Sequence, residues 1–129
     1  MFRSIAIASA LGSLLLTSLP GGSEPASEIE GPRNEVEWSA KLAKDVGGQA
    51  EARLPDGSRV DILTDKVAWE VEFSDSWEQA IGQSTYYGLA TNRSAGVWLL
   101  LRGKHDEDYL RCLLVCRHLG IELKTTKTQ

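Results

Sequence analysis

Three acidic residues and a glutamine in the middle of the chain have the types and the order of a metal-dependent site. Asp61 is followed by Glu70 and Glu72, and Gln83 comes after them. Carboxylate oxygens are the ligands that hard cations such as Mg²⁺ prefer. A bound cation lowers the pKa of a water molecule and offsets charge on a phosphate. These residues therefore indicate phosphodiester hydrolysis.

Two segments in which apolar and polar residues alternate carry the acids. The segments 58–64 and 67–73 lie next to each other along the chain. Alternation is typical of half-buried strands, so a short turn between two such strands would bring Asp61 close to Glu70. Glu70 and Glu72 are two residues apart, which places both on the same face of their strand.

The remaining segments predict the elements that position these strands. We expect helices over residues 35–46, about 74–90 and 106–119, and further strands over 49–54, 96–102 and 121–125. Asn34 and Ser74 have side chains suited to cap helices, and Gly47 follows the end of the first one. The order of these elements, αβββαβαβ, predicts an α/β domain.

In the first helix we expect the inward-facing residues to be Val36, Trp38, Ala40, Leu42 and Ala43. We also expect Trp69, Trp77 and Trp98 to anchor the core.

The chain of 129 residues is long enough for one domain. Residues 1–26 combine a short basic start, an apolar run and a Pro-Gly break, which is typical of a signal peptide. Residues 27–33 predict a flexible linker, and 34–129 the folded domain. These features predict an exported protein, periplasmic or secreted, without a stable membrane anchor after processing. The alternative is a cytoplasmic protein whose start codon is wrongly assigned. The net charge of −4 does not decide whether the chain binds nucleic acid.

Cys112 and Cys116 are four residues apart in a predicted helix. An even number of cysteines in an exported protein suggests a disulfide, but the geometry within one helix is unfavourable. The favoured interpretation is that both are small buried apolar side chains.

The order of elements and residues resembles the PD-(D/E)XK nuclease superfamily, with its restriction endonuclease-like three-layer core. Asp61 corresponds to the motif's Asp, and Glu70-Val71-Glu72 to its (D/E)-X-K triplet. Gln83 and Tyr87 correspond to the Gln-x-x-x-Tyr motif of the RecB-like branch. The resemblance covers about residues 34–125.

The resemblance implies a site that binds Mg²⁺ or Mn²⁺ and cleaves nucleic acid, most readily DNA. Asp61, Glu70 and the backbone carbonyl of Val71 would be metal ligands. The superfamily also places an accessory acid on the first helix, at Glu35 or Glu37 in this chain, and Glu37 is taken as the ligand. Gln83 would hold the water or a phosphate oxygen.

One position departs from the motif, because Glu72 stands where the superfamily uses lysine. Glu72 would act as a base or a second metal ligand, and Lys66 or Lys104 would supply the missing cation. The alternative function is a module that keeps the nuclease fold but binds without cleaving. A third possibility is a structural protein whose acids form a solvated face. No separate recognition domain is evident, so specificity would come from a partner or a homodimer.

Overall fold

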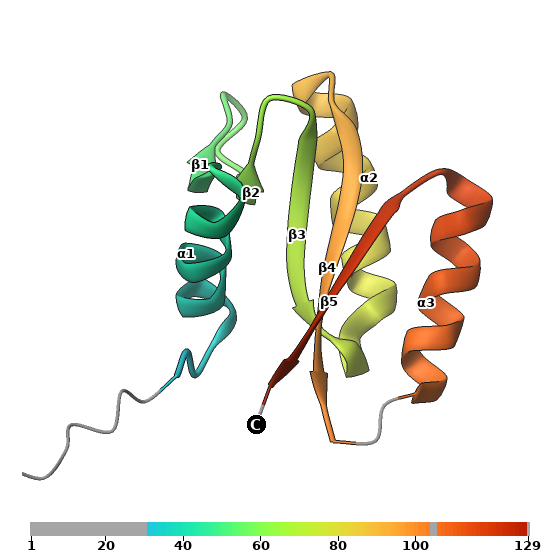
Figure 1. Ribbon diagram of the computed structural model, residues 1–129. Coiled ribbons are helices and arrows are strands. Elements are labelled where there is room, and N and C mark those ends of the chain that lie inside the picture. The colour runs from blue at the N-terminus through green and yellow to red at the C-terminus, as the bar shows by residue number, and fades with distance from the viewer. Residues whose placement is uncertain (1–30, 104–105, 129) are drawn as a thin grey trace, which may run out of the picture.

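The elements follow one another in the order that the sequence predicts. The computed structural model describes residues 31–103 and 106–128 (Figure 1). The elements are α1 (Glu35–Val46), β1 (Gln49–Arg53), β2 (Arg59–Leu63), β3 (Val67–Phe73), α2 (Trp77–Thr91), β4 (Ser94–Arg102), α3 (Asp106–Leu119) and β5 (Glu122–Thr128). The predicted signal peptide and all but the end of the predicted linker lie outside the described residues.

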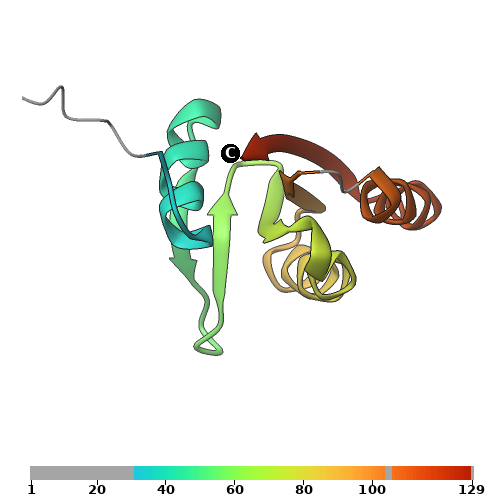
Figure 2. The same ribbon diagram turned by 90° about the horizontal axis from the view of Figure 1, so that it is seen from below.

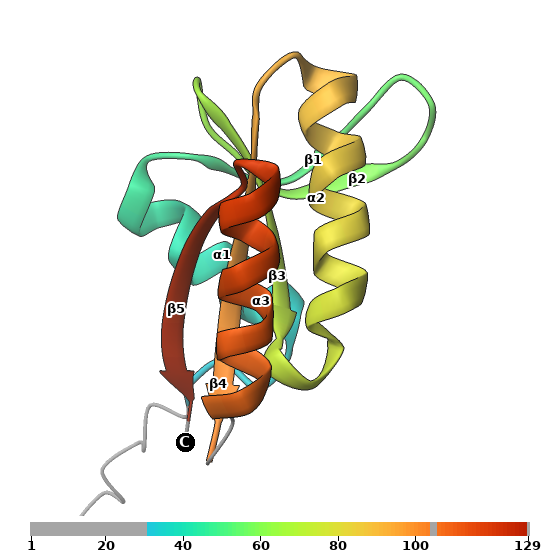
Figure 3. The same ribbon diagram turned by 90° about the vertical axis from the view of Figure 1, so that its right-hand side faces the viewer.

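The five strands form one mixed sheet in the order β1-β2-β3-β4-β5. The first three strands run antiparallel, while β3, β4 and β5 run parallel to one another. The helix α1 covers one face of the sheet, and α2 and α3 cover the other (Figures 1 and 3). Parallel neighbours need a crossover connection, and α2 and α3 supply the two that this sheet requires.

The first helix is fixed at both ends by local hydrogen bonds. The Asn34 side chain accepts from the Glu37 N–H, and Gly47 takes the left-handed conformation at the other end. The side chains that this helix buries are Trp38, Ser39, Leu42 and Ala43. The predictions for Val36 and Ala40 were wrong, because the helical turn carries both onto the exposed side.

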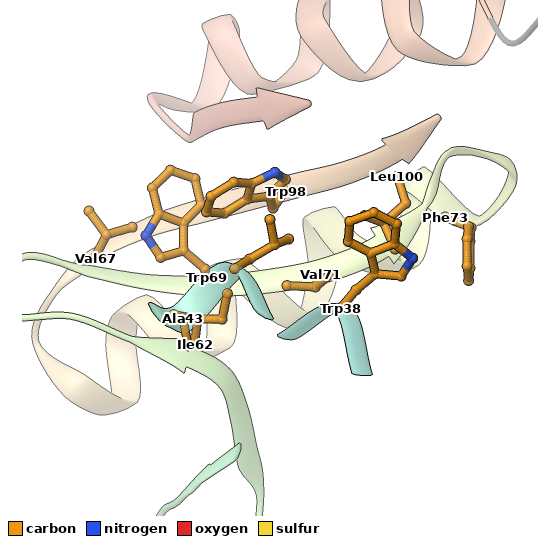
Figure 4. Packing of buried hydrophobic residues seen from close by; sticks show 10 residues of the cluster. Trp38, Ala43, Ile62, Val67, Trp69, Val71, Phe73, Trp98 and Leu100 are labelled. Carbon is orange, nitrogen blue, oxygen red and sulfur yellow. The ribbon is translucent and has the colours of Figure 1, made fainter. Parts of the chain in front are cut away.

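Most of the aromatic core lies between α1 and the sheet. The Trp69 and Trp98 rings meet edge to face, with centroids 5.6 Å apart, and Trp38 approaches them from α1 (Figure 4). A second cluster, under α2 and α3, contains Cys112 and Cys116. Both cysteines are buried and free, as the favoured interpretation predicted. The core anchors Trp69 and Trp98 are confirmed.

The second helix begins later than the sequence suggested. Ser74–Ser76 form a 3₁₀ turn, and α2 starts at Trp77 with no side-chain cap. The Ser74 side chain is buried under this turn, so it does not cap the helix.

None of the helices in the described ranges is long and apolar enough to cross a bilayer.

The close packing of β4 against β3 leads to a test of the core. A Cβ added at Gly96 would lie 2.7 Å from Val67 Cγ1 and 2.8 Å from Trp69 Cδ2. We expect Gly96→Ala to lower the free energy of unfolding by about 1–3 kcal/mol in urea titrations, because the overlapping side chains are buried.

Gly82→Ala is the matched control, since Gly82 lies within α2 and nothing stands within 4 Å of the added atom. It should raise stability by about 0.5–1 kcal/mol through helix propensity. A Gly96→Ala variant as stable as the Gly82→Ala variant would contradict this packing.

Candidate active site

A hydrogen bond from the backbone of β3 to a carboxylate of β2 marks the start of the site. Val71 N donates to Asp61 Oδ2 at 2.8 Å. Closer to the β2–β3 turn the two strands pair directly, at Ile62 with Trp69 and at Leu63 with Ala68. At the point where the strands part, the Asp61 side chain thus accepts the hydrogen bond of the Val71 N–H. This bond holds the carboxylate in one orientation.

The space where the strands part is a pocket of about 670 Å³. Its lining comes from α1, the β1–β2 hairpin, β3 and α2. In Figure 2 the ribbon of β3 lies between those of β2 and α2. The lining residues are Glu35, Arg53, Gly57, Arg59, Asp61, Glu70, Glu72, Ser76, Gln79, Gln83 and Tyr87. All four residues predicted to be catalytic, Asp61, Glu70, Glu72 and Gln83, are therefore brought together.

The accessory acid that the pocket contains is Glu35 and not Glu37. Glu37 lies outside the lining and accepts hydrogen bonds from Arg33 N and Asn34 Nδ2 at 2.9 and 3.2 Å. These contacts hold the Glu37 side chain at the start of the helix, beside its N-cap residue Asn34. Glu35 stands two residues earlier, and its side chain faces the pocket.

The four acids of the pocket are arranged as two carboxyl pairs. The Asp61 and Glu70 groups are hydrogen-bonded to each other, and so are those of Glu72 and Glu35. Glu70 and Glu72 are only 5% and 8% exposed. The acids are therefore not a solvated face, which was the third possibility drawn from the sequence.

Burial is the main cause that raises the pKa of these groups. It raises the pKa of Glu70 to about 9, with further contributions from the charges of Asp61 and Glu72. The pKa of Glu72 rises to about 8 through burial and then through its hydrogen bond with Glu35. The pKa of Asp61 rises to about 6, again mainly by burial. Near neutral pH the pocket therefore holds protons, which allows four acids to lie together.

The carboxylate oxygens of the pocket suit a hard cation that is bound by few protein ligands. Among the described residues, no three acidic, histidine or cysteine side chains converge as a ready ligand set. Mg²⁺ is commonly held by only one or two carboxylates and by several waters, and the pair Asp61–Glu70 meets that need. Glu70 Oε2 is also buried, and no N–H group or hydroxyl of the described residues donates a hydrogen bond to it. A cation that displaced the protons of the Asp61–Glu70 pair would therefore meet an oxygen with no competing donor.

No lysine of the described chain lines the pocket. Lys66 lies in the β2–β3 turn, at the opposite end of β3 from Glu72, and Lys104 is outside the described residues. The Val71 side chain points away from the pocket into the α1-side core, so only its backbone is available to the site.

Several lining residues escaped the sequence analysis, although signals for them exist. Gln79 precedes Gln83 and Tyr87 at helical spacing, so the three share one face of α2. Arg53 and Arg59 lie on either side of the Pro-Asp-Gly-Ser turn, and the hairpin register pairs them. Tyr87 serves two roles, because it is buried against the sheet and also borders the pocket.

No protein-family model matches the chain, and neither does any curated protein or solved structure.

The buried acids lead to a prediction about stability and pH. The folded pKa values of Glu70 and Glu72 lie above their ordinary value of 4.5, so the folded state binds more protons than the unfolded state between those limits. In the absence of metal, this contribution to stability is complete below about pH 4.5 and is lost as the pH rises through about 8–9. We expect thermal unfolding in EDTA to show a decreasing melting temperature over this range.

Glu70→Gln should flatten this decrease and unfold at a higher temperature than the wild type at alkaline pH, because the amide carries no charge. Glu122→Gln is the control, since Glu122 is exposed on β5. A wild-type melting temperature that rises or stays constant across this range would contradict the burial of these acids.

Proposed function

We propose that the chain is a metal-dependent nuclease of the PD-(D/E)XK type that hydrolyses phosphodiester bonds, with DNA as the preferred substrate. One observation carries the proposal: Asp61, Glu70, Glu72 and Gln83, spread over two strands and a helix, line one pocket. The mixed sheet with helices on both faces supports the restriction endonuclease-like core that the proposal requires.

In this proposal Asp61 and Glu70 hold the cation, with the backbone carbonyl of Val71 as a further ligand. A bound Mg²⁺ or Mn²⁺ would acidify a water molecule and offset the charge of the phosphate. The N–H of Val71 orients the Asp61 carboxylate. Such outer contacts are a common way to fix a metal ligand.

The other lining residues have roles that follow from their chemistry. The Gln83 amide donates hydrogen bonds without charge, so it is suited to a phosphate oxygen or the attacking water. Glu72 is the candidate general base, because its pKa of about 8 lies close to neutral pH. Glu35 is the carboxyl partner of Glu72 and takes the place of Glu37 as the accessory acid.

The cleavage assay follows directly from these roles. The full chain should cut DNA in Mg²⁺ or Mn²⁺ and stop in EDTA. Asp61→Asn and Glu70→Gln should each reduce the rate by more than about 100-fold, since each removes a ligand of the cation that would offset the charge of the transition state. Asp65→Asn should keep wild-type activity, because Asp65 lies in the exposed β2–β3 turn. Full activity in both pocket variants would contradict the site.

A second candidate is the nuclease-fold module that binds without cleaving. It is favoured by the carboxyl pair of Glu72 with Glu35 and by the absence of lysine from the lining described above. In that case the wild-type chain would not cleave DNA under any metal condition.

Glu72→Lys separates the two candidates. The new ammonium would lie beside Glu35, which can hold it as an ion pair in the position where the superfamily uses lysine. We expect the wild type to cleave and Glu72→Lys, which loses the candidate general base, to cleave more slowly. Cleavage by Glu72→Lys alone would identify the natural chain as the non-cleaving module.

A further inference from the structure

Two arginines face the acids across the same pocket. Arg53 and Arg59 are direct cross-strand neighbours in the β1–β2 hairpin, and both line the pocket and are exposed. Like charges directly opposite each other on an antiparallel pair destabilise it. The proposed hydrolysis does not assign either residue a role. A phosphate between the two guanidinium groups would remove the repulsion.

The two arginines differ in how they are held. Arg59 forms an ion pair through Nε with Glu51, which occupies a positive φ of 55°. Positive φ is uncommon for a residue other than glycine, and here it falls between the Ala50–Ile62 and Ala52–Val60 pairs of the hairpin. A guanidinium has five N–H donors, so the remaining donors of Arg59 can bind a ligand while Glu51 holds it.

Arg53 has no carboxylate partner among the described residues. Arg53 therefore adds to the hairpin wall of the pocket a positive charge that is not paired with a carboxylate of the described residues. Arginine forks match the geometry of phosphate oxygens, which makes this wall suited to a second phosphate beside the one at the acids.

A contact between the hairpin turn and α2 lies beside the pocket. The Tyr86 hydroxyl donates to Asp56 Oδ2, and Asp56 is in turn fixed by Ser58 N at 2.9 Å. The Tyr86 ring lies against Tyr87, with centroids 5.6 Å apart. Gly57 of the same turn lines the pocket, so this contact bounds the space beside it.

The size of the space limits the form of the substrate. A volume of about 670 Å³ is typical of a cleft that holds one small ligand. The Glu70 and Glu72 side chains that line it are buried. Sites for single-stranded nucleic acid combine cations along the strand's backbone with aromatic side chains, and the lining of this pocket includes Arg53, Arg59 and Tyr87.

We infer that the pocket takes a single strand of nucleic acid, or the unpaired end of a duplex, and that Arg53 and Arg59 bind the phosphate next to the scissile one. This inference deepens the proposed function and rests on it for the identity of the scissile phosphate. Arginine-dependent strand binding, however, is measured without cleavage.

The test is binding of a fluorescein-labelled oligothymidylate to the full chain in EDTA, followed by anisotropy at several salt concentrations. Arg53→Ala and Arg59→Ala should each weaken binding and reduce the slope of log affinity against log salt. The double variant should reduce this slope by about 0.7 in total, the share of the one phosphate that the two arginines bind. A blunt hairpin duplex of DNA should bind more weakly than the single strand.

Two controls make the result specific. Arg117→Ala removes an exposed arginine from α3, which contributes nothing to the pocket lining, and should leave the slope unchanged. Arg53→Lys with Arg59→Lys keeps the charge and should keep the slope, which separates loss of phosphate contacts from damage to the hairpin. Wild-type slopes in the alanine variants, or an equal loss in Arg117→Ala, would overturn the arginine assignment. Equal affinity for the duplex would overturn the single-strand assignment.

The same measurements separate this inference from the proposed function. Arginine-dependent strand binding by a chain that never cleaves in Mg²⁺ would contradict the nuclease proposal and support the arginine site. Cleavage by a chain whose strand binding does not depend on either arginine would support the nuclease proposal and contradict the arginine site.

Discussion

The hydrogen bond from Val71 N to Asp61 Oδ2 is the contact on which the site depends. A buried backbone N–H must have an acceptor, and in a regular ladder the neighbouring strand supplies a carbonyl. Here the acceptor is a side chain, placed just beyond the direct pair of Ile62 with Trp69. Because a carboxylate satisfies the donor, β2 can part from β3 without an unsatisfied backbone group, and the space between them becomes the pocket.

The strand β3 separates the two environments that the domain contains. Every residue of this strand is buried, but alternate side chains meet different surroundings. Trp69 and Val71 join the apolar cluster beneath α1, whereas Glu70 and Glu72 face the pocket toward α2. Well-packed apolar residues on one face hold the strand in place, which allows the other face to carry carboxyl groups whose burial is unfavourable when they are charged.

Much of this arrangement follows from the sequence because it is encoded locally. Alternation of residues and turn signals between segments predict the strands, and two-residue spacing predicts that Glu70 and Glu72 share a face. The start of α2 was missed because the 3₁₀ turn at Ser74–Ser76 depends on packing under the helix. A local signal was also present for Glu37, since Asn34 and Glu37 have the spacing of a capping box.

Other features of the site depend on contacts between distant segments. The pairing of Glu72 with Glu35 joins the end of β3 to the start of α1, and no spacing rule predicts it. The hydrogen bond from Tyr86 to Asp56 likewise joins α2 to a turn 30 residues earlier. Such contacts depend on how the hairpin and the helices pack against the sheet, so local sequence patterns do not predict them.

The central claim is that Asp61 and Glu70 form a site for a divalent cation, and calorimetric titration of Mn²⁺ into the metal-free chain tests it most directly. The account predicts saturable binding in the wild type, with protons released from the carboxyl pairs as the ion binds. It predicts that Asp61→Asn abolishes this binding and that Asp65→Asn leaves it unchanged. No heat of binding in the wild type, or equal binding in both variants, would contradict the account.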